Sequence, residues 1–175
     1  EQQNVVFGGK STSVREYPIS IEWPSRWIDF KESNAECRSR IRQLNHLPSD
    51  RMIGVGVDRL DYTKGILERF MAVERLFELY PEWRGKFSFI QIAAPTRTSI
   101  NEYQNFEQHV TAMAARINNK FGSEDYQPII LKIEHHEPKQ IFEYYRAVDL
   151  CMVTSLHDGM NLVAKEFVSA REDEK

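Results

Sequence analysis

Two basic residues stand close together in the run 58–65, directly after an apolar segment. Arg59 offers a planar donor fork and Lys64 a point charge, and a glycine follows them at the start of a helical stretch. Such a group suits a phosphate or a diphosphate. Two solvated loop charges, paired with Asp58 and Asp61, would explain the same pattern. Neither a Walker loop nor a Gly-x-Gly-x-x-Gly turn is present, which excludes the common ATP and dinucleotide motifs.

A second group of polar residues follows the last apolar segment, over residues 154–166. The turn at Asp158 and Gly159 is expected to direct backbone N–H groups into a helix start, which is a ready anion site. Asp158 is placed to accept sugar hydroxyls. Glu166 would repel a phosphate and therefore suits a diol such as ribose. The alternatives are a helix-capping role for Asp158 and a solvated helix face for Glu166 and Lys165.

Two further candidates follow the other apolar segments. Arg97 could bind an anionic substrate, although an isolated arginine also suits a surface salt bridge. The pair His135 and His136 invites a metal interpretation, but consecutive residues rarely point at one ion. A loop that lines a base or ring of a ligand is the favoured functional interpretation, and we expect no metal site.

The elements that must position these residues alternate regularly from residue 52 onward. Apolar runs at 52–57, 87–93, 129–133 and 150–153 predict buried strands. Apolar stripes at helical spacing follow each run and predict helices near 66–80, 102–121, from Pro138, and at 161–170. This order predicts an α/β fold with a doubly wound, mainly parallel Rossmann-like sheet, whose ligands bind at the carboxyl ends of the strands.

The first 50 residues are organised differently. The run 14–21 alternates in polarity around Pro18 and predicts an interrupted strand at an edge or in a crossover segment. Residues 32–44 predict one short polar helix. Gly8 and Gly9 are expected to interrupt regular secondary structure.

Composition narrows the function classes. The 175 residues carry 23 basic and 26 acidic side chains, for a formal charge of −3, so nucleic acid is not the electrostatic default partner. No apolar run is long enough to span a membrane. The N-terminal residues lack the basic and apolar regions of a signal peptide, and we expect a cytoplasmic protein. Cys37 and Cys151 lie far apart in sequence, which argues against a disulfide scaffold and a thiolate zinc site.

The runs 57–65 and 158–166 together resemble the trehalose-6-phosphate synthase family, and so do residues 91–97 and 115–118. The resemblance covers the chain from about residue 17 onward. It implies a retaining glycosyltransferase of the GT-B type, built from two Rossmann-like domains, that transfers glucose from a nucleotide-diphosphate sugar to a sugar phosphate. A close relative, glucosylglycerol-phosphate synthase, shares both runs. ADP-glucose with glycerol 3-phosphate is therefore the alternative to UDP-glucose with glucose 6-phosphate, and a non-catalytic nucleotide-sugar-binding module is a further alternative.

The resemblance also implies roles for individual residues. The catalytic residues would be Arg59 and Lys64, which would bind the diphosphate and stabilise its charge as it leaves. No metal or cofactor is implied, since the nucleotide sugar is a substrate. Asp158 would bind the glucose hydroxyls, and Glu166 the ribose. The glucose and the phosphate would be supported by the backbone of Gly159, Met160, Asn161 and Leu162. His136 would border the uracil, and Arg97 would contact the acceptor phosphate. No protein nucleophile is implied, because the family is thought to use a front-face substitution.

Length is the main departure from the resemblance, since the family's enzymes are more than twice as long. We therefore expect residues 1–50 to be a crossover segment from an absent N-terminal domain. Residues 51–175 are expected to be part of the nucleotide-sugar-binding, C-terminal half. By itself this length of chain is expected to be inactive, and the resemblance allows a homo-oligomer in a full-length parent protein.

Overall fold

The computed structural model describes residues 3–28, 31–96 and 101–172. Its elements are the strands β1 (Gln3–Phe7), β2 (Lys10–Val14), β3 (Met52–Arg59), β4 (Phe87–Ala94), β5 (Ile129–Lys132) and β6 (Leu150–Cys151), the helices α1 (Asn34–Leu44), α2 (Ile66–Leu79), α3 (Asn101–Phe121), α4 (Pro138–Ala147) and α5 (Val163–Ala170), and the 3-10 turns η1 (Tyr62–Lys64) and η2 (Pro81–Trp83).

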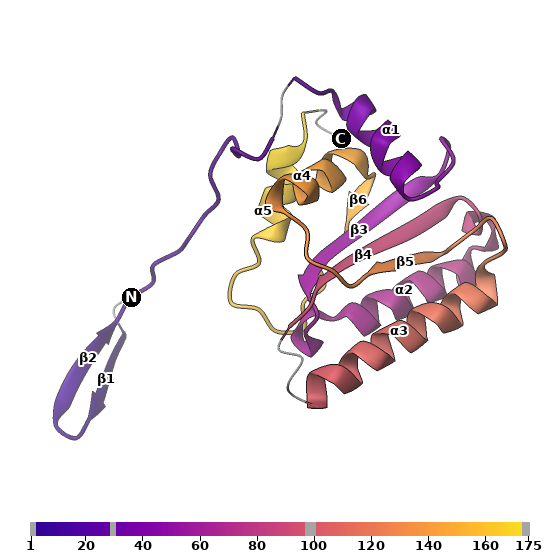
Figure 1. Cartoon of the computed structure of the whole chain (residues 1–175). Helices are drawn as coiled ribbons and strands as arrows, with labels where there is room; N and C mark the ends of the chain where they lie inside the picture. Colours follow the sequence, from indigo (N-terminus) through magenta and orange to yellow (C-terminus); the bar gives the residue numbers. More distant parts are fainter. Residues whose placement is uncertain (1–2, 29–30, 97–100, 173–175) are drawn as a thin grey trace.

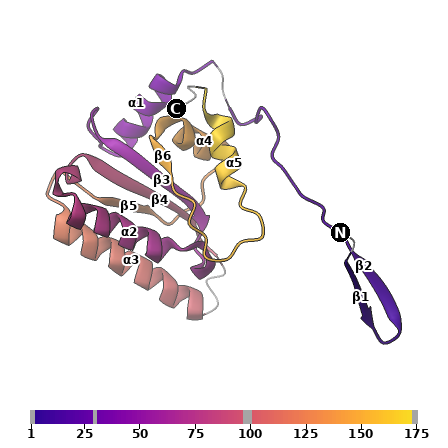
Figure 2. The same cartoon turned by 180° about the vertical axis from the view of Figure 1, so that it is seen from behind.

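The main sheet is parallel throughout and has the strand order β5-β4-β3-β6. In register, Val55 lies beside Ile90, which lies beside Ile130. Helices α2 and α3 cover one face of the sheet, and α1, α4 and α5 cover the other (Figures 1 and 2). The prediction of a parallel α/β sheet covered on both faces is confirmed.

Alternating strand residues build a separate core on each face. In β4, Phe89 packs toward α2 and α3, whereas Ile90 and Ile92 pack toward α1 and α4. All three side chains are buried. Because both faces of the sheet are apolar, the strands read in sequence as continuous apolar runs, which is why they were predictable.

The strand predicted at 14–21 is wrong. β2 ends at Val14, and residues 15–22 belong to no strand. Pro18 has no backbone N–H and cannot extend a strand ladder. Val14 pairs backward instead with Gln3, across a turn in which Gly8 and Gly9 have φ of 55° and 76°.

The remaining differences lie at element ends. The last predicted strand is shorter, because only Leu150 and Cys151 pair with β3. The final helix begins at Val163 rather than 161, because the Asn161 side chain accepts a hydrogen bond from the Val163 backbone N–H at 2.9 Å. The sequence Ser99-x-x-Glu102 predicts a capping box at the start of α3, but Ser99 lies outside the described residues.

The hairpin β1–β2 and the segment that follows it extend away from the sheet before the chain returns to α1 (Figure 1). Part of this segment lies near α5, where the Lys165 ammonium donates to the Ile19 carbonyl at 3.4 Å. Helix α1 packs against α4.

Candidate functional site

The loops after β3 and β6 lie against each other at the carboxyl end of the sheet. The backbone N–H groups of Leu156 and His157 both donate to the Thr63 carbonyl, at 2.8 and 3.2 Å. Gly65 has a φ of 66°, and a Cβ at this position would overlap the Thr154 carbonyl oxygen. A glycine is therefore required for the loops to approach this closely.

An ion pair joins the two loops. The Lys64 ammonium lies 2.6 Å from Asp158 Oδ2, and the two side chains are only 14% and 22% exposed. The hydrogen bond from Lys64 is the main reason that the pKa of Asp158 lies below its usual value. Lys64 thus pairs with a residue 94 positions away rather than with either acid of its own run.

Arg59 projects to the surface. Its side chain is 66% exposed, and a guanidinium nitrogen lies 3.9 Å from Asp61 Oδ2. The pairing with Asp61 that was left open in the sequence is thus present as a loose contact. A guanidinium this exposed is free to turn toward a ligand at the mouth of the site.

The start of α5 completes this side of the site. The Asn161 amide and the Ser155 hydroxyl donate to Asp158 Oδ2, at 3.2 and 3.4 Å. Gly159 and Met160 lie in an exposed turn just before the helix. Next to the start of α5, it is the Asn161 side chain, and not that of Asp158, that accepts a hydrogen bond from the Val163 backbone N–H. Among the described residues, the hydrogen bonds that the Asp158 side chain accepts all reach its Oδ2 atom.

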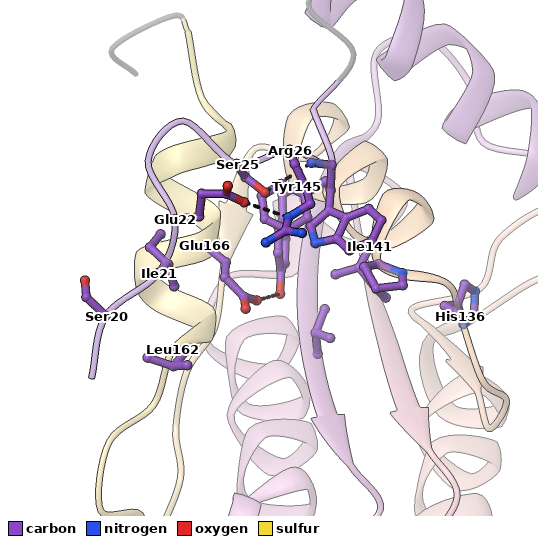
Figure 3. Close-up of a pocket in the computed structure, with 14 residues that line it drawn as sticks. Ser20, Ile21, Glu22, Ser25, Arg26, His136, Ile141, Tyr145, Leu162 and Glu166 are labelled. Atoms are coloured by element: carbon purple, nitrogen blue, oxygen red, sulfur yellow. Dashed lines mark hydrogen bonds and ion pairs between the residues drawn. The ribbon is translucent and has the colours of Figure 1, made fainter. Parts of the chain in front are cut away.

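Two adjoining cavities hold most of the residues predicted to act. The smaller, of about 190 Å³, is lined by residues that include Arg59, Lys64 and Asp158. The larger, of about 630 Å³, is lined by residues that include His136 and Tyr145 (Figure 3). Val57, Leu162 and Glu166 line both cavities; Met160 and Asn161 line the smaller one.

Glu166 faces the cavities rather than open solvent. The Tyr145 hydroxyl donates to Glu166 Oε2 at 3.3 Å, and Figure 3 shows the two groups facing each other. Tyr145 is fully buried, and this burial raises the pKa of its hydroxyl. The hydroxyl therefore stays protonated and orients the carboxylate, which leaves the other carboxylate oxygen for a ligand.

His136 lines the far side of the larger cavity (Figure 3). Its side chain is 9% exposed, its Nε2 lies 3.5 Å from Glu134, and its ring meets Tyr144 edge-on at 5.8 Å. Its Nδ1 is buried and has no hydrogen-bond partner among the described residues. A buried nitrogen of this kind is suited to a polar group of a ligand.

Two parts of the site were missed in the sequence. The segment 20–27 lines the larger cavity, where Glu22 and Arg26 form an ion pair at 2.8 Å. Beneath the two loops lies Arg69, which is 1% exposed. A basic residue at a helix position between buried Ile66 and Phe70 was the available signal for it. The acceptor candidate Arg97 lies outside the described residues.

Over residues 3–28, 31–96 and 101–172, no three His, Cys, Asp or Glu side chains gather as they would around a metal ion. In the same residues, no helix combines the length and apolar character that a membrane span requires.

The sequence pattern of glycosyltransferase family 20 matches residues 1–175. A UDP-forming alpha,alpha-trehalose-phosphate synthase from Pichia angusta is 36% identical over 174 residues, which are 99% of this chain and 36% of that protein. The crystal structure of such a synthase from Burkholderia xenovorans, in complex with glucose-6-phosphate, matches with a TM-score of 0.86 and 34% identity, over 98% of this chain and 37% of that one. An E. coli structure labelled trehalose-6-phosphate and bound with UDP-2-fluoro glucose matches with a TM-score of 0.80 and 34% identity, over 98% of this chain and 39% of that one. The chain thus spans little more than a third of each relative.

Proposed function

Because the chain belongs to glycosyltransferase family 20, we propose that it is the donor-binding part of a retaining glucosyltransferase. The proposed reaction transfers glucose from UDP-glucose to glucose 6-phosphate and yields α,α-trehalose 6-phosphate and UDP. The UDP-forming trehalose-phosphate synthase of Pichia angusta supports this assignment, as do the glucose-6-phosphate in the Burkholderia structure and the UDP-2-fluoro glucose in the E. coli structure.

The observation that carries the proposal is that the smaller cavity, which holds an ion pair, adjoins the larger one. Lys64 and Asp158 form an ion pair in the smaller cavity, and Glu166 lies where that cavity meets the larger one. A nucleotide sugar needs this arrangement, because it carries a diphosphate between a nucleoside and a sugar. Cavities of a few hundred cubic ångströms are typical of small-molecule sites.

Each part of the donor has a proposed partner. Arg59 and Lys64 bind the diphosphate and stabilise the charge that develops as it leaves. Asp158 accepts the glucose hydroxyls, and the backbone from Gly159 to Leu162 supports the glucose and the phosphate. Glu166 accepts the ribose hydroxyls. The acceptor attacks on the face from which the diphosphate departs, without a protein nucleophile.

The base and the acceptor have proposed partners as well. His136 borders the uracil, and Arg97 contacts the acceptor phosphate. Residues 1–50 are proposed to be a crossover segment from an N-terminal domain, and residues 51–175 part of the C-terminal, nucleotide-sugar-binding domain. The full-length parent is proposed to be cytoplasmic and to catalyse the complete reaction, whereas the 175 residues alone are inactive.

Calorimetric titration of the 175-residue chain tests this proposal without requiring turnover. UDP, UDP-glucose, ADP-glucose and GDP-glucose are compared under one condition, with circular dichroism to verify the fold. We expect saturable binding of UDP and UDP-glucose. A folded sample that binds none of the four would refute the donor-binding role, and a preference for ADP-glucose would favour the glucosylglycerol-phosphate alternative.

A further inference from the structure

Arg69 lies in the second turn of α2 on the apolar stripe that faces the sheet. Its side chain has no exposed surface. Removing a guanidinium from water is costly unless its hydrogen bonds are replaced by well-placed partners. None of the proposed ligand contacts involves Arg69, because its side chain is buried and lines neither cavity.

The guanidinium of Arg69 bonds to residues of β3 and β4 and of the loops after β3 and β6. Its Nη1 donates to Asp58 Oδ2 at the end of β3 and to Gln91 Oε1 in β4, both at 2.7 Å. Its Nε donates to Thr154 Oγ1 after β6, at 3.1 Å. Its Nη2 donates at 3.4 Å to the backbone carbonyl of Lys64. One side chain therefore holds both loops that carry the Lys64–Asp158 pair.

The neighbouring sequence is fitted to this side chain. A Cβ at Gly56 would overlap Arg69 Nη1 and lie 2.7 Å from Gln91 Oε1. Any larger residue at position 56 would therefore displace the guanidinium. Gln91 is fixed in turn, because its amide donates to the Gly56 carbonyl at 3.2 Å and the Ile92 carbonyl at 3.1 Å. Asp58, with a side chain 4% exposed, offsets the positive charge.

We propose that Arg69 is a positioning residue for nucleotide-sugar binding, which holds the loops after β3 and β6 at the separation where Lys64 and Asp158 can close on one donor. This inference rests on the proposed function. It differs from a general stabilising role because it predicts a loss confined to the diphosphate part of the ligand. The nucleoside part is bound by His136 and Glu166, which Arg69 does not contact.

Two variants test the proposal. Arg69→Lys keeps the charge and loses the fork that reaches four partners at once. Thr154→Val keeps the shape and removes the acceptor of Arg69 Nε, so it remains informative should Arg69→Lys fail to fold. Arg146→Lys is the matched control, since Arg146 is also buried, at 2% exposure, but bonds to Asn34 and the Glu32 carbonyl near α1.

The measurement compares UDP with uridine, which lacks phosphates, by calorimetry and NMR titration. We expect Arg69→Lys to weaken UDP binding about tenfold or more and Thr154→Val about threefold, as for loss of charge-assisted and single hydrogen bonds. Uridine affinity should stay within about twofold of wild type in both variants, and Arg146→Lys should not separate the two ligands.

Three results would overturn the proposal. Unchanged UDP affinity in both folded variants shows that Arg69 does not position the loops. An equal loss for UDP and uridine shows a structural role alone. A wild-type chain that binds uridine but not UDP shows that the two loops do not bind a diphosphate. A wild-type chain that binds neither ligand refutes the proposed function itself.

Discussion

The Lys64–Asp158 ion pair provides the sharpest prediction, because its two members should respond to substitution in opposite directions. In the structure the Lys64 ammonium lies 2.6 Å from Asp158 Oδ2. A bound diphosphate must replace the Asp158 carboxylate as the partner of the Lys64 ammonium. Lys64→Met removes a charge-assisted hydrogen bond to the ligand, worth about 1.5–3 kcal/mol. UDP affinity should therefore fall roughly 10- to 150-fold.

Asp158→Asn should instead strengthen UDP binding severalfold. The substitution removes a negative charge beside the diphosphate and frees Lys64 from its present partner, while the side chain keeps its size. The same variant should bind UDP-glucose less well relative to UDP, because an amide is a poorer acceptor for the glucose hydroxyls than a carboxylate. A fall in the affinity for UDP-glucose relative to UDP identifies Asp158 as a sugar contact.

Calorimetry at low ionic strength measures both effects, since salt screens such interactions. Lys120→Met is the charge-matched control: Lys120 pairs with Glu74 and Glu78 on the α2–α3 surface, away from the cavities. This control should leave UDP affinity unchanged. The reasoning fails if Lys64→Met and Lys120→Met have equal effects, or if Asp158→Asn weakens UDP binding.

Three further predictions concern stability and the nucleoside. The pKa of Glu74 is lowered to about 2, mainly by a hydrogen bond from Arg116. Its contribution to the free energy of unfolding is full above the unfolded pKa near 4.5 and is lost as the pH falls through the folded pKa of about 2. Glu74→Gln should therefore cost about 1 kcal/mol in urea melts at pH 7, about half as much at pH 3 and little below pH 2, and an equal cost at pH 7 and below pH 2 would contradict this reasoning. Gly65→Ala should lower the free energy of unfolding by more than Gly85→Ala, because both glycines have positive φ but only a Cβ at position 65 meets backbone; equal losses would contradict the required close approach. Tyr145→Phe removes the hydroxyl that orients the Glu166 carboxylate and should weaken uridine binding about two- to fivefold in NMR titrations. An unchanged affinity would show that this hydrogen bond does not prepare Glu166 for the ribose.

The sheet was predictable from sequence because burial on both faces makes each strand a continuous apolar run. Ile53 and Val55, on β3, and Ile90 and Ile92, on β4, have this character. The hairpin β1–β2 was not predictable in the same way. Val5, Val6 and Phe7 are exposed, so their pattern carries no information about a core.

The site was predictable only in part, for a related physical reason. Local runs indicated which residues follow the strands, and parallel strands bring such residues to one edge. The contacts between the runs 58–65 and 154–166 could not be predicted, because Lys64 and Asp158 are 94 residues apart in the sequence. Arg69 was missed because hydropathy treats an arginine as a surface residue, whereas Gly56, Gln91 and Asp58 build a polar niche for it inside the core.

The most direct test of the donor-binding account is a titration of the isotopically labelled chain with UDP, followed by backbone amide NMR. The account predicts shifts that saturate together in the loop 58–65, in the segment 154–166 and around His136, while α3 and the hairpin β1–β2 stay unchanged. Shifts that do not saturate, or that gather outside these three regions, would contradict the claim that the two adjoining cavities form one nucleotide-sugar site.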